Sequence, residues 1–443
     1  MNRTIAAGLV CLAGLFSTQA LAQTTPPPPP APAVPYLPDY TAMQEGKPVD
    51  TRPPEIAGGQ PVFPEQTRAP YHKTAPYKLT EITSGLHAPW GLAFLPDGKF
   101  LVAERAPGAF RVVSPDGSIA PPVTGFEALG VTWPAIGLFD FVPDSGFAKN
   151  HRLYFTFFAF DRGMIGGIQV ARATFDQAAN ALRDVKVIFS THPSTPSDDN
   201  PGFGARSGGS IALGPDGLLY VTIGDRDAGR PFPWRVAQTL DTDLGKIIRI
   251  TKDGKPAPGN PFIGRKDALP EIWAIGQRSQ EGLAFDAQGN LWETEHGPRG
   301  GDELNLIKKG GNYGWPIISH GIDYPGPRMG DAEVARPGME QPAYYWSPST
   351  GPSGLAYYDA DLFPEWKGSL LAGMLRGNSI ERLTIRDGKV VNEEPLLTEL
   401  HLRIRTVKVG PDGAVYALTD SGNGGAGFDK TPATSKLVKL TPK

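Results

Sequence analysis

The sequence predicts an all-β protein, a six-bladed β-propeller built from four-stranded antiparallel blades. One pattern recurs along the chain: an apolar run, a turn rich in Pro, Asp or Gly, and a second apolar run, as in a β-hairpin. Its copies lie roughly 45–75 residues apart, which is typical of a repeat architecture. With 54 Gly and 46 Pro among 443 residues, long helices are disfavoured. Because a hairpin cannot bury both of its faces alone, we expect the copies to stack radially.

Six copies of the hairpin pattern can be followed in order. They begin at Gly91, Gly137, Ser210, Gly282, Gly354 and Val407. Solenoid repeats are usually shorter and more regular, so the spacing favours a propeller. Two irregular insertions, residues 176–208 and 323–341, are predicted to be loops. Long loops gathered on one face of a propeller are where a functional site is expected.

The first residues predict an export signal. Residues 1–22 contain Arg3, an apolar run and an Ala-Leu-Ala sequence that ends at Ala22, which is typical of a secretory signal peptide cleaved after Ala22. The run is too short to be read as a membrane span, and no later run approaches that length. Cys11, the only cysteine, lies within this segment, so the mature chain has no disulfide. We expect a secreted protein, or a periplasmic one in a Gram-negative source.

The next part of the chain is expected to be a linker. Residues 23–40 are dominated by proline and predict a stiff polyproline II segment. This segment is either a tether for docking or, as we favour, a disordered lead-in. Residues 41–75 remain rich in turn formers. We therefore expect a Pro-rich linker and N-terminal extension over residues 23–76 and the propeller domain over residues 77–443.

Charge and composition narrow the range of partners. The chain has 43 Lys and Arg against 46 Asp and Glu, a net charge of −3, and 40% hydrophobic residues. The hydrophobic content suffices for a large core. Without a basic run to neutralise phosphates, a nucleic-acid partner is not expected.

The most informative stretch is residues 271–317. It contains the hairpin GLAFDAQGNLWET, which ends abruptly in EHGPRGGDE, residues 295–303. Three glycines and a proline in so short a piece allow sharp turns that expose backbone carbonyls. Carbonyls beside Asp302 and Glu303 are the oxygen ligands that Ca²⁺ prefers. Arg278, just before the hairpin, is a permanent cation suited to an anionic ligand. A polar loop that caps a sheet is the alternative.

The order of the residues in this stretch resembles that of a known protein family. EIWAIGQR, GLAFDAQGNLWETEHGPRGGDELNLI and GGNYGWP together closely resemble the soluble PQQ-dependent aldose sugar dehydrogenases, relatives of soluble quinoprotein glucose dehydrogenase. The resemblance extends from about Leu79 to Leu440. It implies a propeller that holds pyrroloquinoline quinone (PQQ) at its top face, a Ca²⁺ that polarises the quinone, and a histidine that takes the alcohol proton as hydride passes to the quinone. The implied substrate is a sugar or related alcohol. The electron acceptor and the oligomeric state stay open.

The resemblance also implies cofactor-binding residues. Arg278, Arg376, Arg403 and Arg405 stand where the family places the basic residues that bind PQQ, with Arg376 in place of the usual lysine. Arginine suits the three carboxylates of PQQ because it can pair with a carboxylate through two hydrogen bonds. Arg403 and Arg405 alternate along a predicted strand, so their side chains should point the same way.

Two further residues are expected near the cofactor. His296 occupies the position beside the cofactor in the aldose dehydrogenase branch; a purely structural histidine is the alternative. Trp346 either stacks over the planar quinone or is a simple core residue.

The implied metal ligands lie in and after the same loop. Gly297 and Pro298 match the positions whose carbonyls bind the Ca²⁺ that bridges to the cofactor. Glu303 and Tyr313 match a second, structural Ca²⁺ site. For Glu303, an ordinary carboxylate at a strand end is the alternative.

The sequence departs from the family at the expected base. The family motif His-Phe-Gly-Gly-Arg precedes the third hairpin, where this chain has Arg-Ser-Gly-Gly-Ser. Arg206 therefore replaces the histidine and Ser210 replaces the arginine. Ser279 stands in place of an asparagine, and Ala135 in place of a glutamine. A guanidinium stays protonated at ordinary pH and cannot act as a general base.

Several groups could replace the missing base: Asp225, Asp227, His192 or an acid of the substrate. We therefore favour a PQQ-dependent oxidoreductase of sugars or related alcohols with an altered base. The alternative from another class is a catalytically inactive propeller that binds a small ligand or a protein. A metal-dependent hydrolase of the lactonase type is less favoured, although propellers support many chemistries.

Overall fold

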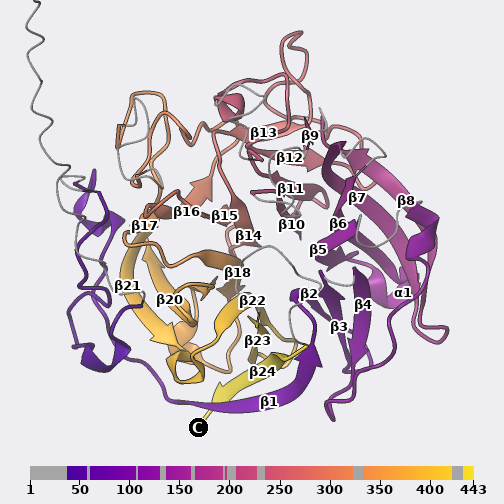
Figure 1. Ribbon diagram of the computed structural model, residues 1–443, viewed down its shortest axis with the longest axis horizontal. Helices are drawn as coiled ribbons and strands as arrows, with labels where there is room; N and C mark the ends of the chain where they lie inside the picture. Colours follow the sequence, from indigo (N-terminus) through magenta and orange to yellow (C-terminus); the bar gives the residue numbers. More distant parts are fainter. Residues whose placement is uncertain are drawn as a thin grey trace, which may run out of the picture. The chain divides into compact units, whose positions relative to one another are not determined.

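The computed structural model describes residues 37–443, except 57–59, 106–107, 130–135, 161–164, 193–194, 197–205, 227–234, 323–332 and 422–432. The predicted signal peptide, the proline-rich residues 23–36, Ala135 and Asp227 lie outside the described residues. Within them, six antiparallel sheets follow one another around a common axis in chain order (Figure 1). The predicted six-bladed β-propeller is thereby confirmed.

The strands of the six blades are as follows, from the innermost strand outward. Blade 1 contains β2 (Pro89–Phe94), β3 (Phe100–Glu104) and β4 (Ala109–Val113). Blade 2 contains β5 (Ile136–Pro143), β6 (Arg152–Phe160), β7 (Ile165–Asp176) and β8 (Ala181–Ser190), with the short β9 (Thr195–Pro196) paired to β7. Blade 3 contains β10 (Gly208–Leu213), β11 (Leu219–Ile223), β12 (Lys246–Ile250) and β13 (Ile272–Ile275). Blade 4 contains β14 (Gln280–Phe285), β15 (Leu291–Glu295), β16 (Asp302–Ile307) and β17 (Tyr344–Trp346). Blade 5 contains β18 (Pro352–Tyr358), β19 (Ser369–Met374), β20 (Ser379–Arg386) and β21 (Lys389–Leu396). Blade 6 contains β22 (Arg403–Val409), β23 (Val415–Asp420), β24 (Ser435–Pro442) and β1 (Tyr77–Leu86).

Each of the six predicted hairpins forms the inner pair of strands of one blade. The innermost strands β2, β5, β10, β14, β18 and β22 contact one another in sequence, and β22 contacts β2 to complete the ring. These strands are almost wholly buried, as in the patterns of β2 and β18. The short apolar runs of the sequence are therefore the part of each blade that is buried against both neighbours.

The ring is closed by the two ends of the propeller. β1 pairs antiparallel with the C-terminal strand β24, from Tyr77 opposite Pro442 to Leu86 opposite Ser435. The indigo and yellow strands lie side by side in Figure 1. Because β1 precedes blade 1 in the chain and β24 is the last strand, this pairing ties the beginning of the propeller to its end.

Helical structure is confined to single turns. The described residues contain one short α-helix, α1 (Phe147–Asn150), between β5 and β6. The 3₁₀ turns are η1 (Tyr40–Ala42), η2 (Pro64–Gln66), η3 (Phe126–Leu129), η4 (Val236–Gln238), η5 (Pro364–Trp366) and η6 (Thr398–Leu400). No helix among the described residues has the length and apolarity needed to cross a membrane.

One of the two predicted loops is wrong. Residues 176–208 contain β8, the fourth strand of blade 2, which is only partly buried along most of its length. An outer strand is partly solvated, and β8 lies outside the inner hairpin pattern on which the prediction was based, so its sequence was interpreted as part of an insertion. The described part of the second insertion, residues 333–341, contains no strand.

Residues 37–76, which we call the N-terminal strap, run beside blades 4 and 5 (Figure 1). η2 contacts β17 and β21, and the amide of Ala69 donates to the Tyr344 hydroxyl at 2.9 Å. Thr74 Oγ1 bonds Glu394 at 2.6 Å and Trp366 Nε1 at 2.8 Å. Residues 35–443 form one compact unit, so the strap belongs to the same body as the propeller.

Candidate functional site

The predicted site residues gather at one edge of the propeller. In each blade the start of the innermost strand is paired with the end of the second strand, as in Gln280 with Glu295 and Arg403 with Asp420. Residues just before the first strand and just after the second therefore meet at the same edge. Arg206, Arg278 and Arg403 precede or begin first strands, whereas Asp225, His296 and Arg376 follow second strands.

Six of the predicted residues line one small pocket at this edge. Gly297, Pro298, Glu303 and Tyr313, the four candidate metal ligands, share it with Arg278 and His296. Its free volume is about 10 Å³, which is the space of one water molecule or one ion. The pocket can therefore hold a cation, whereas a cofactor of PQQ size has to lie outside it.

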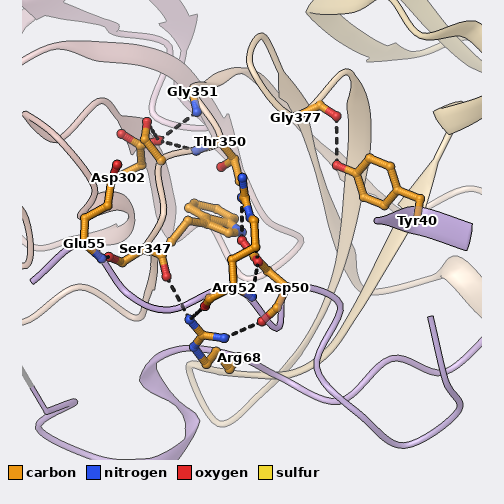
Figure 2. Close-up of polar contacts among 12 residues, drawn as sticks. Tyr40, Asp50, Arg52, Glu55, Arg68, Asp302, Ser347, Thr350, Gly351 and Gly377 are labelled. Atoms are coloured by element: carbon orange, nitrogen blue, oxygen red, sulfur yellow. Dashed lines mark hydrogen bonds and ion pairs between the residues drawn. The ribbon is translucent and has the colours of Figure 1, made fainter. Parts of the chain in front are cut away.

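Asp302 fixes the loop that supplies the predicted carbonyl ligands. It is 1% exposed, and its Oδ1 accepts the Gly297 N–H at 2.9 Å. Its Oδ2 accepts from Ser349 Oγ at 2.6 Å and from the amides of Thr350 and Gly351 at 2.8 and 2.7 Å (Figure 2). Both carboxylate oxygens of Asp302 accept hydrogen bonds from the protein, so Asp302 holds the loop in place and is not a free metal ligand.

The loop is also tightly packed. A Cβ on Gly297 would lie 2.3 Å from the carbonyl oxygen of Gly301, and one on Gly301 would lie 2.4 Å from the Gly321 amide. Gly301 also has a φ of +69°, which favours glycine. The glycines predicted to permit sharp turns are therefore required by close backbone approach.

Three glutamates form a cluster here: Glu295 and the half-buried Glu303 line the pocket, and the buried Glu293 lies next to them. A single amide, Asn305 Nδ2, donates to Glu293, Glu295 and Glu303 at 3.1–3.2 Å. Burial, followed by hydrogen bonds and charges of neighbouring groups, sets the pKa of Glu295 at about 7. Burial and then the Glu295 charge raise the pKa of Glu303. Such a cluster favours either bound protons or a nearby cation.

Tyr313 also lines the pocket. Its hydroxyl donates to the Leu306 carbonyl at 2.5 Å and accepts from the Lys308 amide at 2.8 Å. The hydroxyl is thus committed to the end of β16. Among the described residues, no group of three or more His, Cys, Asp or Glu side chains is arranged as a metal centre.

Arg278 links the pocket to Arg206. Arg278 Nη1 donates to the His296 carbonyl at 2.9 Å, and its guanidinium lies 5.2 Å from the ring of Trp315. The indole of Trp315 donates to Asp225 Oδ2 at 2.7 Å. The same oxygen lies 3.5 Å from Arg206 Nη1. Arg206, which the sequence predicts to stand at the position of the family histidine, is therefore held beside Asp225 in a left-handed backbone conformation with a φ of 48°.

Arg403 and Arg405 point the same way, as predicted. Both lie near Asp420 Oδ2, at 3.6 and 3.4 Å. Arg405 also donates to Glu281 Oε2 at 3.0 Å, and Glu281 Oε1 is 3.8 Å from His296 Nδ1. These contacts join blades 4 and 6 across the axis of the propeller.

Arg105 is a member of this group that the sequence did not single out. Its guanidinium lies 5.3 Å from the ring of Trp90, where Arg405 stacks at 4.0 Å. Burial, and then the charge of Arg405, lower the pKa of Arg105 to about 9. An anion in this region would relieve both effects.

Sequence reasoning also missed Glu281, Asp420 and Trp315. A usable signal was present, because Asp420 ends the second strand of its hairpin, as Glu295 does in blade 4, and Arg105 directly follows the second strand of its own, as His296 does. Comparing the six hairpins position by position would have found both.

Other candidates lie apart from this pocket. Trp346 is 5% exposed in a core cluster with Tyr344 and Leu304, and its indole donates to Glu393 at 2.7 Å. The structure thus places Trp346 among core residues on the outermost strand of blade 4. Exposed His192 bonds Asp243 through its backbone at 2.7 Å.

Three further residues that the sequence singled out, Arg376, Ser210 and Ser279, make polar contacts. The Arg376 amide donates to the Thr350 carbonyl at 2.9 Å. Ser210 is 2% exposed and donates to the Glu281 carbonyl at 2.7 Å. Ser279 Oγ lies 3.3 Å from Glu281 Oε1.

A larger cavity of about 760 Å³ lies at the opposite edge, where the innermost strands end. It is lined by apolar residues such as Leu95, Leu213, Phe285 and Val409, and Lys408 is its one charged lining residue. A tricarboxylate needs several cations, so this cavity does not suit PQQ.

Comparison with known proteins identifies the family. Residues 86–427 match the model of the glucose/sorbosone dehydrogenase family. The aldose sugar dehydrogenase YliI of Escherichia coli is 34% identical over 361 residues, which cover 81% of this chain and 91% of that protein.

Two solved structures are also similar. The apo-form crystal structure of the soluble aldose sugar dehydrogenase of Escherichia coli has a TM-score of 0.73 and 31% identity, and the match covers 83% of this chain and 100% of that one. The PQQ-bound aldose sugar dehydrogenase of Streptomyces coelicolor has a TM-score of 0.64 and 26% identity, with 84% and 100% covered. The resemblance found in the sequence is confirmed: this chain belongs to the glucose/sorbosone dehydrogenase family.

Proposed function

We propose that this protein is an exported, PQQ-dependent oxidoreductase that oxidises an aldose sugar or a related alcohol. One observation carries the proposal. In a member of this family, the four candidate Ca²⁺ ligands line one ion-sized pocket together with Arg278 and His296, at the edge of the propeller where further arginines converge. Export rests on the sequence of residues 1–22.

The residues at this edge fit an anionic cofactor. Arg105, Arg403 and Arg405 are accompanied by the carboxylates of Glu281 and Asp420, and Arg278 lies on the other side of His296. The three guanidiniums of Arg105, Arg403 and Arg405 against these two carboxylates leave positive charge for an incoming tricarboxylate, whereas the charge of Arg278 is opposed by Glu295. Moreover, His296 Nε2 is buried without a hydrogen-bond partner among the described residues, so it is available to a cofactor.

The same edge fits a hard cation. Backbone carbonyls and carboxylates are the ligand types that Ca²⁺ takes. Glu293 Oε1 and Asn305 Oδ1 are buried oxygens without a partner among the described residues, beside Glu295 and Glu303. A cation in the pocket would balance this concentration of acidic oxygen. The pocket has room for one cation, so we assign to it the Ca²⁺ next to the cofactor, with Gly297 and Pro298 as ligands. A second, structural Ca²⁺ at Glu303 and Tyr313 rests on the sequence resemblance alone, since the Tyr313 hydroxyl is bonded to Leu306 and Lys308.

When bound, PQQ would accept the hydride from the alcohol carbon of the substrate. Arg278, Arg376, Arg403 and Arg405 would bind its carboxylates and so set its orientation. His296 would donate or accept one hydrogen bond at Nε2. Trp346, which lies in the core, is not assigned to stacking; the indole of Trp315, by contrast, lies against Arg278.

Asp225 is the best candidate for the proton acceptor. It is the carboxylate beside Arg206, at the position left without a histidine. An ionised carboxylate can accept the alcohol proton, and Arg206 would stay charged and hold it in place. Exposed His192 has no described contact with this group.

The experiment is reconstitution followed by dye reduction. The mature protein is loaded with PQQ and Ca²⁺ and assayed with a panel of aldoses and alcohols, beside an Asp225→Asn variant. We expect substrate-dependent dye reduction that falls about 10²-fold or more in Asp225→Asn, with PQQ still bound. PQQ binding without turnover on any substrate would instead support a non-catalytic binding propeller, which Arg206 motivates. The identity of the substrate and of the electron acceptor would follow from the panel.

A further inference from the structure

The N-terminal strap contacts both loops that carry the candidate site. These residues precede the part of the chain that matches the family, residues 86–427. The Tyr40 hydroxyl donates to the Gly377 carbonyl at 2.8 Å, one residue after Arg376 (Figure 2). Glu55 contacts the loop of residues 297–301. The strap therefore touches the site from blade 5 and from blade 4.

Glu55 packs directly on the loop. Its side chain is 4% exposed, and its Oε1 lies 3.4 Å from Arg299 Nε. Its Oε2 is so close to Gly300 that a Cβ there would lie 2.8 Å away. Gly300 also has a φ of +73°. The carboxylate of the strap thus covers the turn that follows Pro298.

A second connection passes through Ser347. The Glu55 amide donates to Ser347 Oγ at 3.1 Å, and Arg68 Nη2 donates to the Ser347 carbonyl at 3.1 Å. Arg68 is itself held by the carbonyls of Asp50 and Arg52 (Figure 2). Ser347 opens the segment whose next residues bind Asp302, and Asp302 binds the Gly297 amide. The strap is therefore joined to Gly297 by an unbroken series of contacts.

We propose that the N-terminal strap is an intramolecular positioning element, with Glu55 as a positioning residue that holds residues 297–301 in their binding conformation. The loop is then ordered when the protein folds, so cation and cofactor binding need not supply the ordering free energy. The identity of the ligands rests on the proposed function, whereas the fixing of the loop does not.

The test compares Glu55→Ala with Glu65→Ala in the full mature chain. Glu65 is a matched control because it is also a strap carboxylate, paired with Lys389 of β21 at 3.1 Å, but it is exposed. Hydrogen exchange is measured in the peptide of residues 296–303 without metal or PQQ. We expect exchange at least ten times faster in Glu55→Ala than in the parent and unchanged exchange in Glu65→Ala. The thermal midpoint is followed in parallel.

The second measurement is PQQ affinity in Ca²⁺. It should fall about tenfold in Glu55→Ala and stay unchanged in Glu65→Ala. If Glu55→Ala does not fold, Ser347→Ala removes the acceptor of the Glu55 amide and should change exchange in the same direction. Parent-like exchange in a folded variant, or equal acceleration in the control, would overturn the proposal. Local acceleration without PQQ binding to any of the proteins would support the strap and overturn the proposed function instead.

Discussion

The four hydrogen bonds of Asp302 make a quantitative prediction about the site. In Asp302→Asn, one acceptor oxygen becomes an NH₂ donor. If the remaining oxygen keeps Ser349, Thr350 and Gly351, the new NH₂ faces the Gly297 N–H, and one buried amide loses its acceptor. A hydrogen bond to a charged group contributes about 1.5–3 kcal/mol, and an unsatisfied buried donor costs about 1–3 kcal/mol. We therefore expect a loss of about 3 kcal/mol in the free energy of unfolding.

Asp286→Asn is the matched control. Asp286 also accepts four hydrogen bonds, from the amides of Gln288 and Asn290 and from the side chains of Asn290 and Trp292, all at 2.9 Å. It lies in the same blade but in the turn between β14 and β15, at the opposite edge. Because it is only half-buried, water can replace a lost acceptor, and we expect a loss of about 1 kcal/mol.

The assay is urea unfolding followed by tryptophan fluorescence, with PQQ titration of both variants in Ca²⁺. Asp302→Asn should weaken PQQ binding at least tenfold, because the carbonyls of Gly297 and Pro298 lose their fixed position. Asp286→Asn should bind within twofold of the parent. Equal loss of affinity for PQQ in both variants, or full affinity in a destabilised Asp302→Asn, would refute the assignment of Asp302 as the residue that holds the loop of Gly297 and Pro298 in place.

Three further predictions concern the base, the cofactor cations and pH. Arg206→His should raise the rate of substrate-dependent dye reduction at least tenfold, because it restores a neutral base beside Asp225. Arg206→Gln should not raise the rate, and equal rates in the two variants would contradict the prediction. Arg403→Gln should weaken PQQ binding about tenfold, and Arg386→Gln, at the exposed end of β20, should leave it unchanged; fluorescence titration of both variants decides. Burial raises the pKa of Glu393 to about 7. Burial, together with the charge of Glu393, also raises the pKa of Glu381. The folded protein therefore keeps protons on these carboxyl groups at pH values above about 4.5, where the unfolded chain loses them. Stability should therefore fall as pH rises from about 4.5 to 7, and Glu393→Gln should flatten this dependence in thermal midpoints at pH 5, 6, 7 and 8; an unchanged slope would be the contrary result.

Much of the fold could be predicted because its inner strands are the most patterned part of the chain. The six hairpins, from Gly91 to Val407, are buried against neighbours on both sides, so their sequences are short and apolar. The outer strands were not predicted, because they are partly solvated. β8 is the plainest case, since most of its side chains are half-buried or exposed.

The site could be predicted where a loop carries its own signal. The sequence of residues 295–303 predicts sharp turns and oxygen ligands, and the structure brings Gly297, Pro298 and Glu303 to one pocket. Arg105 and Asp420 have no such signal in their own loops, because each is a single charged residue at or just after a strand end, and only a comparison of the six hairpins would have found them. Trp346 looked equally suited to a cofactor or a core, and only the packing against Tyr344 and Glu393 distinguishes them.

The strap was the least predictable element. Residues 41–75 have the composition of a linker, and their order comes from partners more than 200 residues away, such as Ser347 for Glu55 and Gly377 for Tyr40. Local propensity contains no information about such partners. The turn-rich sequence therefore predicted a linker and N-terminal extension, and it did not predict the docking.

The most direct test of the proposed function is a calorimetric titration of the mature protein with PQQ, in Ca²⁺ and again after chelation. We expect one PQQ per chain with a Kd in the micromolar range or tighter, and binding weakened at least tenfold without Ca²⁺. Absence of binding in Ca²⁺ would contradict the assignment of this edge as a cofactor site and would separate this chain from the activity of its relatives.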